Sequence, residues 1–151
     1  MRRVLWKLIA ELYIPGPPIA QPRPRLAKRG RFAHAYVPQT HPIHEYRRLI
    51  SEAAKETGMF FKGAVHIEFE FIFQRPKSHW NKSGLTKKAP KFPSKSDWDN
   101  CAKGAQDALN GIAFHDDNQV VSGSFFRGYS DDRDQEGYTK IRISNAKKRS
   151  G

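Results

Sequence analysis

The chain has 151 residues, the usual length of one domain with one hydrophobic core. It has no apolar run long enough to cross a membrane, and its one cysteine, Cys101, excludes an internal disulfide and a zinc site built from cysteines. A formal net charge of +12 indicates an anionic partner, most simply nucleic acid.

The charge is unevenly distributed along the chain. Residues 1–95 hold 19 Lys and Arg against 6 Asp and Glu, whereas residues 96–151 hold 8 against 9. Charge that served only solubility would mix both signs throughout. The segregation therefore predicts a basic surface and an acidic site contributed by different parts of the chain. The opening segment does not resemble an export signal, so we expect a reducing bacterial-type cytoplasm.

The amino-terminal segment 4–14 alternates apolar and polar side chains and predicts a strand. Its expected inward row is Trp6, Leu8, Ala10, Leu12 and Ile14. The prolines and glycine of 15–18 end it. We expect Pro22 and Pro24 to hold the next stretch extended. Its arginines would then follow a phosphate backbone: Arg23, Arg25, Arg29 and Arg31.

A solvated surface loop is the alternative for this stretch. Phe32 and Tyr36 would either stack on bases or anchor the loop, and anchoring is the expectation. Residues 40–57 predict a helix that Thr40 caps and Gly58 ends. Residues 63–73 predict a strand in the middle of the sheet, with Glu68 and Glu70 pointing away from the core.

Residues 75–95 predict a basic, mobile loop without an acidic residue. It either wraps the ligand and becomes ordered on binding, or is a solvated insertion. Its candidate DNA contacts are Lys87, Lys88 and Lys91, and Trp80 is a possible stacking residue. A helix over 97–110, capped by Ser96 and with Trp98 in its buried stripe, then precedes strands over 120–128 and 138–144.

These elements predict one α+β domain over residues 1–146, with a mixed β-sheet packed against two main helices and a basic tail at 147–151. The acidic residues gather around the second helix: Asp97, Asp99, Asp107, Asp116 and Asp117. Asp99, Lys103 and Asp107 follow at four-residue intervals and share a helix face. Converging carboxylates repel each other, and a bound Mg²⁺ or Mn²⁺ removes that conflict.

Each of these features also has an ordinary explanation. Aspartate is common at helix starts, Asp99, Lys103 and Asp107 form a typical surface ion-pair ladder, and Asp116-Asp117-Asn118 suits a turn. Their occurrence together, within about 20 residues of a basic chain, favours a metal site. Such a site would act on phosphodiesters, with Lys103 placed to neutralise charge on the phosphate.

Three motifs resemble those of a known family. They are Asp97-x-Asp99-Asn100-x-x-Lys103, Asp107-Ala108-Leu109-Asn110-Gly111 and His115-Asp116-Asp117-x-Gln119-Val120. In this order they resemble the signature of the RusA-like Holliday junction resolvases, small endodeoxyribonucleases common in bacterial phages and prophages. The amino-terminal region is also similar, at Ile14-Pro15-Gly16-Pro17-Pro18, Arg23-Pro24-Arg25 and Pro38-x-Thr40. Trp98 departs from the pattern, since an aliphatic residue is expected between the two aspartates.

The resemblance implies a homodimer of α+β subunits that cleaves branched DNA, the four-way Holliday junction, in recombination and repair with Mg²⁺ or Mn²⁺. It gives a catalytic role to Asp97, Asp99 and Asp117, with Lys103 in support among the catalytic residues, and makes the three aspartates the metal ligands. Asp116 either shares the metal or orients the turn, and Asp107 either supports the site or pairs with Lys103. A non-catalytic DNA-binding protein and a nuclease for flaps or forks are the alternatives.

Overall fold

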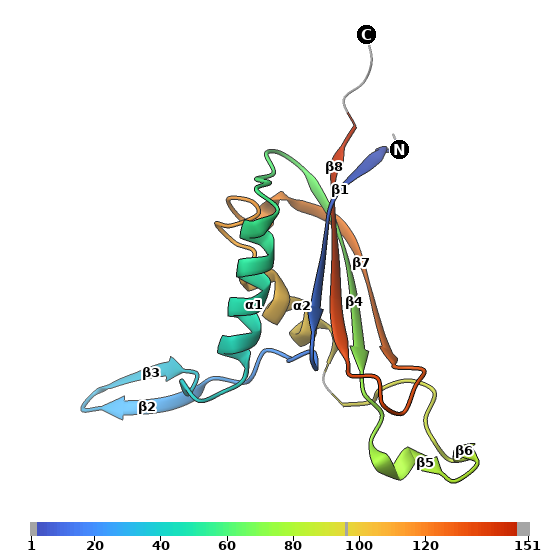
Figure 1. The fold of residues 1–151 in the computed structure, drawn as a ribbon. Helices are drawn as coiled ribbons and strands as arrows, with labels where there is room; N and C mark the ends of the chain where they lie inside the picture. Colours follow the sequence, from blue (N-terminus) through green and yellow to red (C-terminus); the bar gives the residue numbers. More distant parts are fainter. Residues whose placement is uncertain (1–2, 96, 148–151) are drawn as a thin grey trace.

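The computed structural model of the protein describes residues 3–95 and 97–147. Its centre is a four-stranded sheet in the order β1-β8-β4-β7, formed by β1 (Trp6–Pro15), β4 (Val65–Phe73), β7 (Val120–Tyr129) and β8 (Tyr138–Ala146) (Figure 1). β8 is antiparallel to β1 and β4, whereas β4 and β7 are parallel. A parallel pair needs a long crossover, and helix α2 (Trp98–Asp107) lies within it. The predicted mixed sheet with a central β4 is confirmed.

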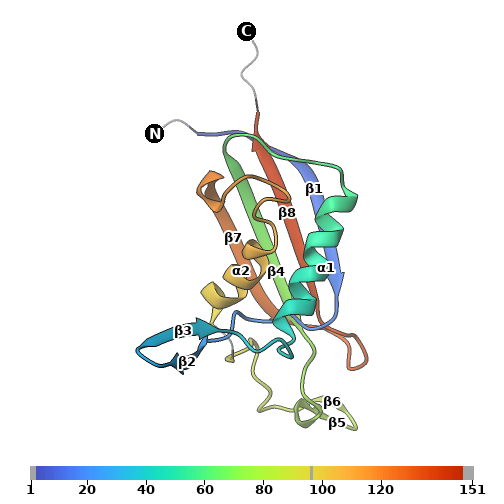
Figure 2. The ribbon, with the colours of Figure 1, turned by 90° about the vertical axis from the view of Figure 1, so that its left-hand side faces the viewer.

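The helices α1 (Ile43–Glu56) and α2 cover one face of the sheet (Figure 2). α1 begins after Pro42, whose φ of −63° already suits a helix, and Nδ1 of His41 accepts the N–H of Ile43 at 3.0 Å. The prediction that Thr40 caps this helix was therefore wrong. Its end was predicted correctly, because Gly58 adopts the left-handed φ of +65° directly after Thr57.

A bulge in β1 decides which of its side chains face the helices. The pairing with β8 shifts between Leu8 and Ala10. Beyond the shift Ala10, Leu12 and Ile14 are buried, whereas Leu8 is 50% exposed. One extra residue in a strand moves the side chains before it to the other face. The predicted inward row from Trp6 to Ile14 was therefore right only for its second half.

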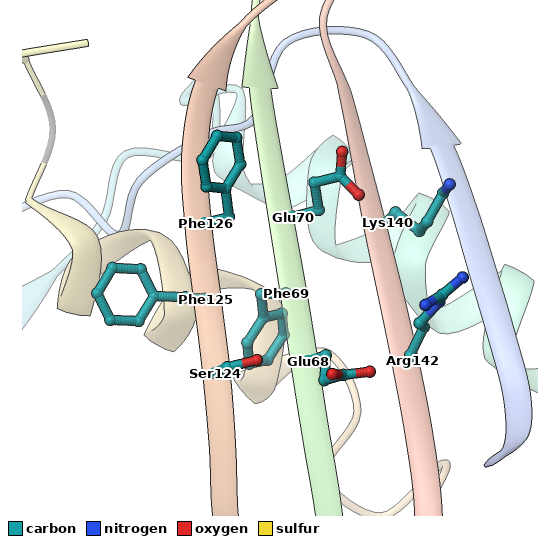
Figure 3. A pocket seen from close by; sticks show the side chains of 8 residues that line it. All are labelled: Glu68, Phe69, Glu70, Ser124, Phe125, Phe126, Lys140 and Arg142. Atoms are coloured by element: carbon teal, nitrogen blue, oxygen red, sulfur yellow. The ribbon is translucent and has the colours of Figure 1, made fainter. Parts of the chain in front are cut away.

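The uncovered face of the sheet carries charged and aromatic side chains (Figure 3). Glu68 and Glu70 of β4 pair in register with Arg142 and Lys140 of β8. With Phe126 of β7 they line a shallow hollow of about 340 Å³. Both glutamates are partly exposed, as their alternation with the buried residues of β4 predicts.

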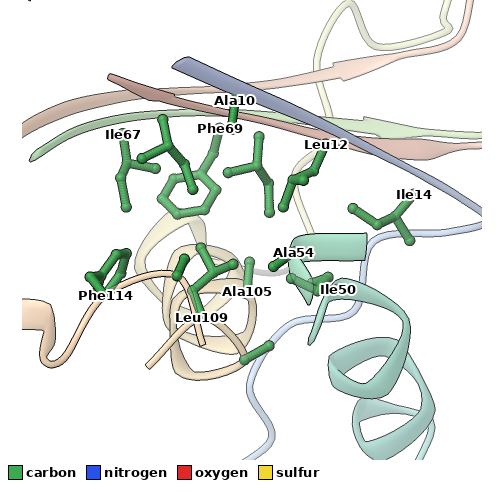
Figure 4. Packing of buried hydrophobic residues seen from close by; sticks show 14 of the residues in the cluster. Ala10, Leu12, Ile14, Ile50, Ala54, Ile67, Phe69, Ala105, Leu109 and Phe114 are labelled. Carbon is green, nitrogen blue, oxygen red and sulfur yellow. The ribbon is translucent and has the colours of Figure 1, made fainter. Parts of the chain in front are cut away.

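The hydrophobic core fills the space between the sheet and the two helices (Figure 4). Its largest fully buried apolar side chains are Phe61, Phe71, Phe114, Ile43, Ile50, Ile67, Leu109, Ile141, Ile143 and Val65. Gly104 lets α2 approach its neighbours closely. A Cβ atom there would lie 3.0 Å from the carbonyl oxygen of Ile19 and 3.1 Å from Cδ1 of Ile43. The chain segment around Ile19 is therefore held against α2.

The basic segment after Pro24 folds as a β-hairpin rather than a loop. β2 (Arg25–Arg29) and β3 (Phe32–Tyr36) form a two-stranded sheet of their own. Figures 1 and 2 show this hairpin projecting from the domain body. Phe32 is 81% exposed and Tyr36 is 41% exposed. The expectation that these two rings anchor the segment was therefore wrong.

Residues 75–95 follow an irregular path with a 3-10 turn (Lys77–His79) and a short hairpin, β5 (Trp80–Asn81) with β6 (Gly84–Leu85). Two arginines connect this segment to the body. Arg75 lies 4.4 Å from the ring centre of Tyr129, and Arg133 lies 5.2 Å from that of Trp80. Ordering of this segment on DNA binding stays a prediction.

Among the described residues, no helix is long and apolar enough to span a membrane.

Candidate active site

Asp97 stands at the start of α2, where the chain passes from extended to helical. Its φ of −64° and ψ of 143° are extended, and its carbonyl oxygen accepts the first helical hydrogen bond from the N–H of Cys101, at 3.1 Å. Its carboxylate caps no backbone N–H. Ser96, the predicted cap, lies outside the described residues. Asp97 is thus extended, as the spacing required, and its carboxylate is exposed beside Asp99.

The start of α2 is fixed to the edge strand β7. The rings of Trp98 and Phe125 stack with centres 4.4 Å apart and an interplanar angle of 5°. Trp98 is 50% exposed, so the prediction that it belongs to the buried stripe was wrong. Its ring instead joins the first turn of α2 to β7. This stack occupies the position where the sequence departs from the family motif.

Arg127 is a residue that sequence reasoning missed. It extends from β7 toward the start of α2, and its guanidinium donates to the carbonyl oxygen of Lys95 at 3.4 Å. Burial raises the pKa of the Cys101 thiol, the charge of Arg127 opposes this rise, and the charges of Asp97 and Asp99 add to it. Arg127 therefore shares its surroundings with the first acidic pair. The proximity of Arg127 to Asp97 and Asp99 arises from the packing of β7 beside α2, which the sequence does not show.

The turn of residues 116–119 carries the second acidic pair and is braced by hydrogen bonds. A carboxylate oxygen of Asp116 accepts the N–H of Asn118 at 3.3 Å. The side-chain carbonyl of Gln119 accepts the N–H groups of His115 and Asp116, at 2.8 and 3.3 Å. The amide of Gln119 donates in turn to the carbonyl oxygens of residues 61 and 63. Asp116 therefore orients the turn, and Gln119 attaches it to the core.

Both members of that pair are exposed, and the pKa of Asp117 is perturbed. The pKa of Asp117 is raised mainly by a hydrogen bond shared with the side chain of Asp116, with contributions from desolvation and from the charges of Asp116 and Asp107. The same hydrogen bond lowers the pKa of Asp116. Two neighbouring carboxylates that share a proton repel each other when both are ionised, and a bound cation would remove that repulsion. The influence of Asp107 also places this turn near the end of α2.

Lys103 is exposed on α2. Within the part of the chain that the structure describes, no ion pair joins it to Asp99 or Asp107. Asp107 instead lies 3.5 Å from a guanidinium nitrogen of Arg47. The surface ion-pair ladder of Asp99, Lys103 and Asp107, which was the ordinary explanation for their spacing, is therefore not formed.

The acidic residues lie in two groups, one at each end of α2. A helix of 10 residues is about 15 Å long. Among residues 3–95 and 97–147, no cluster of three or more His, Cys, Asp or Glu side chains is arranged to hold a metal ion. The donor atoms fit a hard divalent cation in type, since all are carboxylate oxygens. The expected convergence of Asp97, Asp99 and Asp117 is not present in this single chain.

The predicted DNA contacts lie on two projections of the domain. Arg23, Arg25, Arg29 and Arg31 are exposed on and before the hairpin β2–β3, and Lys87, Lys88 and Lys91 are exposed on residues 75–95. In both Figures 1 and 2 these projections lie at the end of the molecule where α2 begins. The first acidic pair therefore lies at the basic end of the domain.

The family model for endodeoxyribonuclease RusA matches residues 15–144. This range includes both acidic groups and all the strands except β1, of which it holds only Pro15, and the last two residues of β8. The chain belongs to the RusA endodeoxyribonuclease family. This confirms the resemblance inferred from the three motifs. Membership also identifies the α+β domain, with its mixed sheet and two helices, as the RusA fold, and it makes a DNA-cleaving enzyme the class to which this chain belongs.

One relative of known sequence resembles this RusA-family chain along most of its length. The uncharacterized protein YqaN of Bacillus subtilis (strain 168) is 33% identical over 123 residues, which cover 78% of this chain and 85% of that protein.

Proposed function

We propose that this RusA-family protein is a metal-dependent endonuclease that resolves four-way DNA junctions in recombination and repair. Family membership carries the proposal, because the family is one of endodeoxyribonucleases and the matched residues 15–144 include all three motifs. The exposed acidic groups along α2, in a chain of net charge +12, support it independently. An enzyme of this kind needs carboxylates for a cation and a basic surface for the phosphates.

In this proposal Asp97 and Asp99 hold Mg²⁺ or Mn²⁺ from the start of α2, and Asp117 completes the set from its braced turn. The ion, when bound, supplies an activated water and neutralises charge on the phosphate. Lys103 lies between the two groups in sequence and stabilises the charge that develops on the phosphoryl oxygens. Each of the three carboxylates is exposed or half-buried and so accessible to an ion, and the loss of ion binding in Asp97→Asn and in Asp117→Asn tests whether they act as one set.

The exposed arginines of 23–31 and lysines of 87–91 bind backbone phosphates without reading the base sequence. Two projections from one end of the domain suit a substrate with arms in different directions. Each phosphate contact releases counterions, so binding weakens steeply as salt concentration rises.

A second copy of the chain completes the resolvase, because two opposing strands of a junction have to be cut. The uncovered sheet face is our candidate for its contact surface. On this face the acidic residues Glu68 and Glu70 lie directly opposite the basic residues Arg142 and Lys140 of the neighbouring strand. Two copies of the face, related by a two-fold axis, could therefore place opposite charges against each other. Tyr13, 56% exposed, and Phe126, 50% exposed, add apolar area. Phe126→Asp should therefore shift the sedimenting species from dimer to monomer.

The direct test is cleavage of a synthetic four-way junction, compared with a linear duplex of the same arm sequence, with Mg²⁺ and with a chelator. The proposal predicts paired nicks in opposing strands of the junction, dependent on the ion and absent from the duplex. Junction binding without nicks, unchanged by the chelator, would identify a non-catalytic DNA-binding protein. Faster cleavage of flaps or forks would identify a nuclease of another specificity.

A further inference from the structure

The register of the hairpin β2–β3 sorts its side chains into two unlike faces. Residues that pair across strands lie on the same face of a sheet, and residues two apart along a strand share that face. Arg25 pairs with Tyr36 and Arg29 pairs with Phe32. We call this the aromatic-basic face, and its side chains are Arg25, Ala27, Arg29, Phe32, His34 and Tyr36. The opposite face carries Leu26, Lys28, Ala33 and Ala35.

Phe32 occupies the far end of the aromatic-basic face, next to the turn. The turn has two residues, and its first, Gly30, adopts the left-handed φ of +60° that such a turn requires. Phe32 directly follows the turn and is 81% exposed. His34 and Tyr36 continue the row behind it, with ring centres 6.0 Å apart. One exposed ring is ordinary, but three aromatic rings and two guanidinium groups on one face form a surface suited to nucleic acid bases and phosphates.

The base of the hairpin is attached to the helix that carries the acidic residues. The N–H of Gln21 donates to the carbonyl oxygen of Asn100 at 2.9 Å. The side chain of Gln21 also accepts a hydrogen bond from Arg47, which reaches Asp107 at the far end of α2. The close approach of Gly104 to Ile19 adds a backbone contact. The position of the hairpin is therefore fixed relative to α2 at its base, while its tip stands free.

We propose that Phe32 stacks on a base at the branch point of the DNA junction, while Arg25 and Arg29 hold the neighbouring phosphates. Bases inside a duplex present only their edges, because their faces are stacked. A branch point interrupts stacking and exposes base faces, and an aromatic ring can cover one of them without regard to sequence. The aromatic-basic face would thus distinguish branched from linear DNA. This inference rests on the proposed function.

The experiment compares the affinity of the parent and of Phe32→Ala for a four-way junction and for a linear duplex, in a chelator so that no strand is cut. Loss of one stacked base weakens junction binding by about tenfold and leaves duplex binding within about twofold. Phe32→Trp, which keeps a stacking ring, should retain junction binding close to that of the parent. Leu26→Ala, on the opposite hairpin face and 75% exposed, is the matched control and should change neither affinity.

A fluorescent base analogue, 2-aminopurine, placed at the branch point gives the second measurement. The parent should alter its emission, and Phe32→Ala should abolish that change while Phe32→Trp retains it. Equal loss of junction and duplex binding by Phe32→Ala, or no loss, would overturn the inference. So would dissociation of a dimer by Phe32→Ala, because the ring would then be covered by a second copy. If the parent with Mg²⁺ cuts no junction, the proposed function itself fails, whatever Phe32 does.

Discussion

The helix α2 and the hairpin β2–β3 are joined through Gln21, which lies just before the hairpin, yet their surroundings are opposite. α2 packs against the core through Cys101 and Ala105, both fully buried, and is fixed at its start by the Trp98–Phe125 stack. Every residue of β2–β3 except Ala27 is exposed. Chemistry requires side chains held in place, whereas binding of a flexible, branched polymer benefits from a projecting surface. Under the proposed function, hydrolysis belongs to α2 and the 116–119 turn, and we propose that recognition belongs to the hairpin.

The largest effect should come from removing one carboxylate at either end of α2. Asp97→Asn and Asp117→Asn should each lower the junction-cleavage rate by about 1,000-fold or more, because each removes an ion ligand. The thermal unfolding temperature should stay close to that of the parent, since both side chains are exposed. Single-turnover cleavage measures the effect. A parent-like rate in either variant would remove that residue from the catalytic set.

Replacing Lys103 should have the next largest effect. Lys103→Gln should reduce the cleavage rate constant by about 100-fold while junction affinity changes far less, because the charge acts on the transition state. Lys55→Gln makes the same charge change on the exposed side of α1 and is the control. If Lys103→Gln weakens binding as much as cleavage, Lys103 is a phosphate contact and not a catalytic residue.

Disruption of the braced turn tests whether anchoring matters for hydrolysis. Gln119→Leu removes the four hydrogen bonds that attach the turn, at Phe61, Gly63, His115 and Asp116. We expect a loss of about tenfold in cleavage rate and in affinity for the ion, as for other residues that orient metal ligands. Asn118→Ala, in the same turn, should behave like the parent. Unchanged cleavage by Gln119→Leu would show that the turn is not a fixed part of the site.

The smallest effect concerns stability and pH. The folded-state pKa of Asp117 is raised, so its ionisation disfavours the folded protein as pH rises through that pKa. In a chelator, Asp117→Asn should therefore unfold at a slightly higher temperature than the parent at pH 7. The difference should vanish well below about pH 4, where aspartates are protonated in both states. Asp131→Asn, on a remote connection, should show no such pH-dependent gain.

Sequence patterns predicted the secondary structure that arises from local periodicity. The strand of residues 65–73 and both helices follow from the spacing of their apolar residues. The bulge before Ala10 was not predictable, because a register shift depends on the partner strand β8. The hairpin β2–β3 was also missed. Its prolines suggested an extended strip, and the pairing between its strands arises at Gly30, a signal that could have been used.

The candidate site was predictable in its members and less so in its arrangement. Motif spacing identified Asp97, Asp99 and Asp117, and the family model covers all of them. Sequence could not place Arg127 beside α2, because that contact joins β7 to the helix start. It also could not show that Asp97 and Asp117 lie at opposite ends of α2 in the free chain. Separation of this kind is set by the path of the loop between helix and strand.

Binding of Mn²⁺ followed by titration calorimetry tests most directly whether the two acidic groups form one site. The account predicts that the parent binds the ion and that Asp97→Asn and Asp117→Asn each weaken the same binding event by about tenfold or more. In the parent, addition of a four-way junction should change the heat of Mn²⁺ binding. Both variants should lose that change. Parent-like affinity in Asp117→Asn alongside lost binding in Asp97→Asn would contradict the account, because the turn would then take no part in holding the ion.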